Sequence, residues 1–150
     1  MEIAEIESEL AGLVLREFDE GAALKLGLAL VRLAGEASLC VVIDIRTANR
    51  TLFHASLPGA AALNDLWARR KSNTALMFQE ASLVVGLRNK AKGETLDHHG
   101  LDSADYADSG GAVPIRVHGV GVVAVATVSG LPQVEDHKLV VRGLKALIGA

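Results

Sequence analysis

The residues best suited to chemistry lie in and around one stretch of the chain, 110–139. Two apolar runs in this stretch predict a β-hairpin, and an Asp-His pair follows shortly after it. A glycine pair precedes the hairpin and a Ser-Gly pair ends it, so the hairpin would bring both pairs to one end of a sheet. We therefore predict a ligand-binding cleft there. On this side of it we expect Gly110, Gly111, Pro114, Ser129, Gly130, Asp136 and His137.

A long helix over about 61–81 is expected to form the other wall of this cleft. Its centre carries Trp67 and Asn73 and, between them, three consecutive cations. Neighbours in a helix point about 100° apart, so these cations cannot all serve one ligand. One arginine, Arg69 or Arg70, would hold an anion or a carboxylate through paired donors. The alternatives are a solvated face with packed stems, or an internal pair between the arginine and Asp136 or Glu135.

Other chemistries find less support. Ser129, His137 and Asp136 could suggest a Ser-His-Asp triad. Asp136 and His137 are neighbours on a helix, however, so their side chains diverge and the aspartate cannot orient the histidine as a general base. No phosphate loop or dinucleotide fingerprint occurs. His98 and His99 are adjacent and point apart, so the acidic segment around them predicts a polar loop over one end of the sheet, without a metal. The sequence assigns no catalytic residue.

Composition narrows the class of protein. The chain has 150 residues, which suits one domain over 1–150, and 50% of them are hydrophobic. A net charge of -3 and 3% aromatic residues argue against binding to nucleic acid. No apolar run reaches the ~20 residues of a membrane span, and the acidic N-terminus resembles no signal peptide. We expect a cytoplasmic protein in which the single cysteine, Cys40, is a buried and inert thiol.

Hydrophobic periodicity predicts an α/β arrangement. The run that ends in Ser129 is apolar on both of its faces, so both faces must be covered. Helices would cover one face, and a second subunit would cover the other, because few elements remain for it. Asp19 is the expected N-cap of an Ala/Leu-rich helix. The expected strands cover 13–15, 39–46, 50–56, 113–118 and 121–129, and the expected helices cover 2–10, 20–36, 61–81, 82–92 and 134–147.

Three blocks of sequence carry a family resemblance. They read LPGAAALNDLWARRKSNTALMF from Leu57, DYADSGGAVPIRV from Asp105 and VSGLPQVEDHKLVV from Val128. From Phe18 onwards the chain resembles an uncharacterised protein family of the haem-degrading, GlcG-like superfamily. The chain departs from the family pattern at Val113, where an aromatic residue is favoured, at Ala124, where glycine is favoured, and around Gln79-Glu80.

The resemblance implies a five-stranded antiparallel sheet with helices packed on one face, and a homo-oligomer. It also makes haem or another tetrapyrrole a candidate ligand, because some distant members of the superfamily bind haem.

Taken together, the residues and the resemblance favour a protein that binds a small, anionic ligand in the predicted cleft. Glycine amides would supply donors, Arg69 or Arg70 the charge, and His137 a proton or a ligand contact. The alternative is an interaction protein that acts through its oligomer and has no small ligand.

Overall fold

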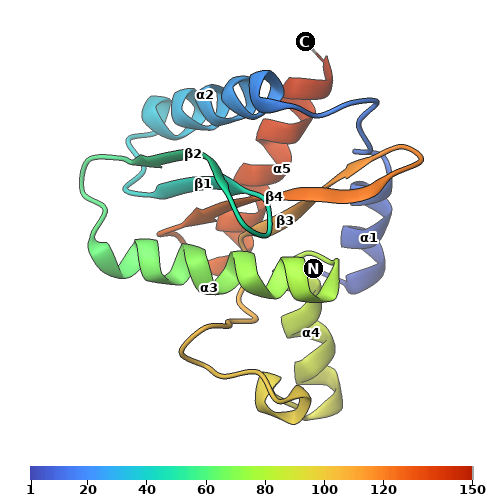
Figure 1. The fold of residues 1–150 in the computed structure, drawn as a ribbon. Helices are drawn as coiled ribbons and strands as arrows, with labels where there is room; N and C mark the ends of the chain where they lie inside the picture. The colour runs from blue at the N-terminus through green and yellow to red at the C-terminus, as the bar shows by residue number, and fades with distance from the viewer. Residues whose placement is uncertain (150) are drawn as a thin grey trace.

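The centre of the molecule is a four-stranded antiparallel sheet, seen in the computed structural model, which describes residues 1–149 (Figure 1). The strands are β1 (Val42–Arg46), β2 (Thr51–Ser56), β3 (Ala112–Val117) and β4 (Gly121–Ser129), in the order β2-β1-β4-β3. The expected hairpin is confirmed as β3 and β4. In the register of β1, Val42 lies opposite Ser129 of β4 and Ser56 of β2.

Helices cover both faces of this sheet. One face packs against α2 (Glu20–Glu36) and α5 (Gln133–Gly149), and the opposite face packs against α3 (Ala62–Phe78) (Figure 1). At one side of the molecule α1 (Ile3–Ala11) packs against α4 (Ser82–Lys92), and a short 3-10 helix, η1 (Leu96–His99), follows α4. No helix within residues 1–149 is long and apolar enough to cross a membrane.

Two expectations about the sheet are wrong. The segment 13–15 is not a fifth strand, because only Leu15 pairs, in a single parallel bridge with Val117. Helices are not confined to one face, because α3 covers the face that was expected to need a second subunit. The side chains that α3 buries there are small or polar, including Ala68, Ser72 and Ala75, so its apolar periodicity is weak and its covering role is not visible in the sequence.

The face under α2 and α5 holds the main hydrophobic core. Ile43 and Ile45 of β1 and Ile115 of β3 pack there with leucines of the two helices. Few aromatics are needed, because small residues let the helices approach closely: a Cβ on Gly143 of α5 would lie 2.5 Å from the side chain of Leu30. These aliphatic contacts supply the apolar burial that drives folding.

The face under α3 is held together by polar contacts. The hydroxyl oxygens of Ser72 and Thr127 are 2.7 Å apart, and both residues are buried. Asp44 of β1 is fully buried, and Arg46 and His54 bond its two carboxylate oxygens. Burial of a polar group costs little free energy only when the group is hydrogen-bonded, and the polar groups on this face have such partners.

Two local expectations have opposite outcomes. The carboxylate of Asp19 accepts a hydrogen bond of 2.8 Å from the amide of Ala22, which confirms it as the N-cap of α2. Cys40, expected to be buried, is exposed. It lies just before β1, where the chain enters the sheet from the surface.

The glycine in α4 allows a test of this packing. A Cβ on Gly86 would overlap the carbonyl oxygen of Asp108, whose side chain also bonds Asn89 of the same helix. Gly86→Ala should therefore lower the free energy of unfolding by about 1–3 kcal/mol in urea denaturation. Gly35→Ala in α2 is the matched control; its Cβ would meet nothing within 4 Å, and it should raise the stability by about 0.5–1 kcal/mol. Equal effects of the two changes would contradict the close contact at Gly86.

Candidate functional site

A cleft of about 270 Å³ opens at the end of β4, where the sequence analysis expected one. One wall comes from the first half of α3, with Asn64 and Trp67. The opposite wall comes from the segments on either side of the hairpin and from the start of α5. The other residues that line the cleft are Lys71, Ser109, Gly110, Ser129, Gly130, Leu131, Gln133 and Asp136.

The cation of this cleft is Lys71, which the sequence analysis did not choose. Its side chain is 3% exposed, and its ammonium donates to the carbonyl oxygens of Gly110 at 3.0 Å and Val128 at 2.8 Å and to Oδ2 of Asp136 at 3.0 Å. All three N–H groups thus have acceptors. Burial lowers the pKa of Lys71, and the attraction of Asp136 opposes this shift.

Asp136 is the partner of Lys71 and also organises the loop after β4. Its Oδ1 accepts a hydrogen bond from the amide of Leu131 at 2.9 Å, and its Oδ2 accepts one from the amide of Gly130 at 3.3 Å. Burial raises the pKa of Asp136, while Lys71 and the two amides act in the opposite direction. The buried cation and the buried anion therefore stabilise each other against a shared desolvation cost.

Gly130, which lines the cleft, and Gly111, which packs against Lys71, are required by close backbone contacts. Gly111 has φ 138°, and a Cβ there would lie 2.5 Å from Nζ of Lys71. Gly130 has φ 147°, and its Cβ would lie 2.5 Å from the carbonyl oxygen of Cys40. Side chains rarely adopt such dihedral angles, so both positions favour glycine. The two glycine-containing segments do converge, and they hold the Lys71–Asp136 pair between them.

Arg69, Arg70 and Asn73 do not line the cleft. Arg69 donates to the carbonyl oxygen of Ala104 at 3.0 Å and to Asp105 at 3.2 Å, and the Asn73 amide donates to the carbonyl oxygen of Asp105 at 2.8 Å. The guanidinium of Arg70 lies 4.5 Å from the centre of the Trp67 ring. These side chains hold the loop that follows η1, which passes along α3 on the side away from the sheet (Figure 1).

His137 and Pro114 also lie outside the cleft. His137 is wholly buried, and its two ring nitrogens have no hydrogen-bond partner among residues 1–149. Burial lowers its pKa and favours the neutral imidazole. Pro114 lines a separate groove of about 340 Å³ beside Leu10 and Val84, with Glu7, Glu80 and Arg116 also in its walls. Of the residues expected at the site, the cleft is lined by Trp67, Gly110, Ser129, Gly130 and Asp136.

A spacing in the sequence could have indicated Lys71. Trp67 and Lys71 are four residues apart, so a helix places them on the same face. Arg69 falls outside that spacing, whereas Arg70, three residues after Trp67, shares it and stacks on the Trp67 ring, so the spacing narrows the choice to Arg70 and Lys71. The sequence analysis preferred arginine because its paired N–H donors match a carboxylate. In the structure the acceptors are three separate oxygen atoms, and these suit the three N–H groups of a lysine ammonium.

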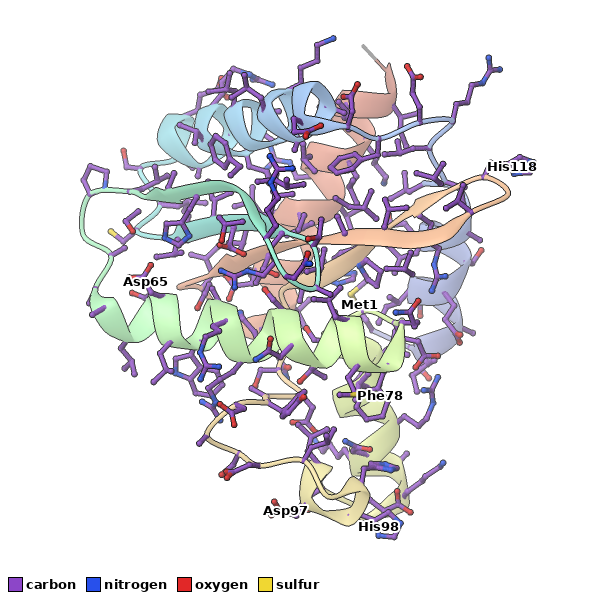
Figure 2. All side chains as sticks on the ribbon, viewed as in Figure 1. Met1, Asp65, Phe78, Asp97, His98 and His118 are labelled. Carbon is purple, nitrogen blue, oxygen red and sulfur yellow. The ribbon has the colours of Figure 1, made fainter. Side chains whose placement is uncertain are left out.

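A second polar cluster, which the sequence analysis missed, joins the edge of the sheet to α3. Nδ1 of His54 lies 2.8 Å from Asp44, and Nε2 lies 2.9 Å from Asp65 at the start of α3, a residue labelled in Figure 2. His54 and Asp44 are opposite each other in the β1–β2 ladder. The cluster therefore links β1, β2 and α3, next to the elements that form the cleft.

Removal of one charge from the cleft should be strongly destabilising. Lys71→Met leaves Asp136 buried without its cation, so we expect a loss of about 3–5 kcal/mol in the free energy of unfolding, measured by urea denaturation. The double variant Lys71→Met/Asp136→Asn should lose less than the sum of the single changes, because no charge is left unpaired. Lys145→Met is the control: its pair with Glu9 is exposed, and its loss should cost about 1 kcal/mol or less. If Lys71→Met cost no more than Lys145→Met, the Lys71–Asp136 pair would contribute little to stability.

Comparison with known proteins identifies the family of the chain. Residues 18–145 match the family model described as haem degrading protein HbpS-like. A UPF0303 protein of Streptomyces coelicolor is 49% identical over 148 residues, which are 98% of this chain and 94% of that protein.

Solved structures agree with this match. The crystal structure of the Ybr137w protein has a TM-score of 0.91 at 31% identity and covers 100% of this chain and 90% of its own. The crystal structure of a PduOC–haem complex has a TM-score of 0.69 at 20% identity, over 89% and 95% of the two chains, and shows a shared fold. The resemblance seen in the sequence blocks is thus confirmed, and the chain belongs to the family described as haem degrading protein HbpS-like.

Proposed function

We propose that the chain binds a small anionic ligand in the cleft at the end of β4. The observation that carries this proposal is the buried Lys71–Asp136 pair in the cleft, in which burial shifts both pKa values. Ionisable residues whose pKa is shifted by burial together with a specific charge partner are concentrated at functional sites. The volume of about 270 Å³ suits a metabolite-sized molecule.

The start of α5 favours an anion in this cleft. The amides of Glu135 and Asp136 both donate to the carbonyl oxygen of Pro132, so the amides of Gln133 and Val134 precede the first bonds of the helix. Such amides and the helix dipole together attract negative charge. Asp136 already balances the charge of Lys71, so the ligand would owe its attraction mainly to the helix start. The serine hydroxyls and Asn64 add neutral donors.

Haem is the alternative ligand, because the family is described as haem-degrading and PduOC was crystallised with haem. Haem iron is held by histidine, cysteine, methionine or tyrosine side chains. None of these lines the cleft, and His137, for which the sequence analysis expected a proton or a ligand contact, is wholly buried. His98 and His118 lie at far ends of the molecule (Figure 2). The residues of this cleft therefore do not fit haem, and we assign haem no role in it.

The single tryptophan gives a direct test, because Trp67 lines the cleft and reports on binding by its fluorescence. Phosphate or malonate should change its emission saturably. Leu131→Glu places a negative charge in the cleft and should weaken the binding at least about tenfold, since about 1.4 kcal/mol of repulsion gives that factor.

Two matched variants serve as controls. Val120→Glu adds the same charge on the exposed turn between β3 and β4 and should leave the affinity unchanged. Arg69→Lys should also have no effect, because Arg69 binds the loop around Asp105. Haem should not compete with phosphate. Equal weakening by Leu131→Glu and Val120→Glu, or a lack of saturation, would refute the proposed site.

A second candidate function, assembly with further copies of the chain, is favoured by exposed leucines. On α2, Leu24 and Leu28 are 52% and 55% exposed, and on α3, Leu63 is 61% exposed. α2 packs on β2, an edge strand of the sheet, and α3 is joined to it through Asp65; the outer side of β2 has no strand partner within residues 1–149. Exposed apolar surface beside an open edge is typical of an interface. The interaction would then be the function, with or without a ligand.

Assembly predicts a change of size when these leucines become charged. Sedimentation at micromolar concentration should show an oligomer for the natural chain and a monomer for Leu24→Asp/Leu28→Asp, because a buried unpaired charge opposes association. Val120→Asp, on the exposed hairpin turn, should leave the oligomer intact. A 15.7 kDa species for the unchanged protein would exclude assembly as its function.

A further inference from the structure

We propose that Lys71 captures a small carbonyl compound in the cleft as a covalent imine, with Asp136 as the group that accepts and returns the proton. This inference rests on the proposed ligand-binding function of the cleft and adds a reaction and a ligand class to it. It assigns a nucleophilic role to a buried lysine and a proton-transfer role to its carboxylate partner.

The contacts of Lys71 give its nitrogen a proton acceptor at the cleft. Lys71 is almost completely buried, yet it is one of the residues that line the cleft. Two of its N–H groups are held by the carbonyl oxygens of Gly110 and Val128, neither of which can accept a proton outright. The third N–H group donates to Oδ2 of Asp136, which lies 3.0 Å from Nζ. The ammonium therefore has one basic neighbour, at hydrogen-bond distance, to which it can give a proton.

Burial makes this proton transfer accessible. It lowers the pKa of Lys71 and raises that of Asp136, so it brings the two groups closer in proton affinity. A neutral amine beside a neutral carboxylic acid avoids the desolvation cost of the ion pair. Lysines desolvated in this way are the ones that act as nucleophiles and form Schiff bases.

The reaction balances with groups that are present. Lys71 first transfers one proton to Asp136, and the freed lone pair of Nζ attacks the carbonyl carbon. A C–N bond forms, and the electrons of the C=O double bond move to oxygen, which takes a proton from the nitrogen. Asp136 then returns its proton to this hydroxyl, which leaves as water while the nitrogen forms the C=N bond. The net change converts an ammonium and a carbonyl into a protonated imine and one water molecule, without an oxidant or reductant.

The expected ligand is a 2-oxo acid of a few carbons. Its keto carbon would meet Nζ of Lys71, and its carboxylate would reach the first amides of α5, around Gln133, on the same cleft. The cleft volume of about 270 Å³ accommodates a molecule of this size. A simple aldehyde would satisfy the covalent step and lack the carboxylate contact.

Trapping of the imine by a reductant tests the proposal on the unaltered protein. The full chain is incubated with pyruvate and cyanoborohydride at neutral pH, and the modified residue is located by peptide mass spectrometry. The other five lysines are exposed and serve as internal controls. We expect one reduced adduct per chain, at Lys71, formed at least about tenfold faster than at any other lysine. Asp136→Asn should slow this labelling, and Lys71→Met should abolish it without increasing the labelling elsewhere.

Binding and capture are separated by a second probe. Lactate resembles pyruvate but has a hydroxyl group in place of the keto carbonyl, so it cannot form an imine and its effect on Trp67 fluorescence reports binding alone. If lactate and pyruvate both bind and the label is spread over the exposed lysines, the imine is refuted and the binding function stands. If neither binds but acetaldehyde labels Lys71 selectively, the reactive lysine stands and the anion preference is refuted. An unlabelled Lys71 together with no binding overturns both.

Discussion

The ammonium of Lys71 is the contact on which the arrangement of four segments depends. From α3 it reaches the backbone before β3, the end of β4 and the first turn of α5. Each of its three acceptors belongs to a different segment, so a shift of any one of them would leave a buried charge without a partner. A loss of that kind costs several kcal/mol, whereas the pair itself contributes little net stability. The contact therefore specifies the relative positions of these segments more than it stabilises the fold.

The two faces of the sheet are built on different physical principles. The face under α2 and α5 is aliphatic, and its packing tolerates rearrangement as long as volume is conserved. The face under α3 is joined by Ser72 and Thr127, by the Lys71–Asp136 pair and by the cluster around His54. Directional bonds of this kind hold side chains in fixed positions, which a binding site requires. The candidate site lies on the polar face for that reason.

Membership of the family and the chemistry of the cleft point to different ligands. The family is described as haem-degrading, and the structural neighbour PduOC was crystallised with haem. One fold, however, can carry many unrelated binding sites. At the end of β4 the side chains are a lysine, carboxylic acid, amide and hydroxyl groups with one tryptophan, and no iron ligand is among them. These groups favour a small polar molecule. The exposed leucines beside β2 belong to α2 and α3, and among them Leu63 directly precedes Asn64, which lines the cleft.

The sequence alone determined the features that depend on neighbouring residues. Asp19 is followed by an apolar helix and caps it, and the alternation in β4 shows a strand buried on both faces. The glycine pair before the hairpin and the Ser-Gly pair at its end located the cleft, because a hairpin must bring its ends together. The family resemblance rests on such local patterns as well.

Only the tertiary structure decided which side chains face the cleft. A helix separates Arg69, Arg70 and Lys71 by about 100° each, but the rotation of α3 is set by its contacts with the sheet, and its weak apolar pattern does not reveal them. His137 illustrates the same limit: one residue after Asp136, it points into the interior while Asp136 faces the cleft. The pairing of Leu15 with Val117, the burial of Asp44 and the covering of the second face by α3 all join segments distant in sequence. Contacts of this kind follow from packing of the whole chain, and no local pattern encodes them.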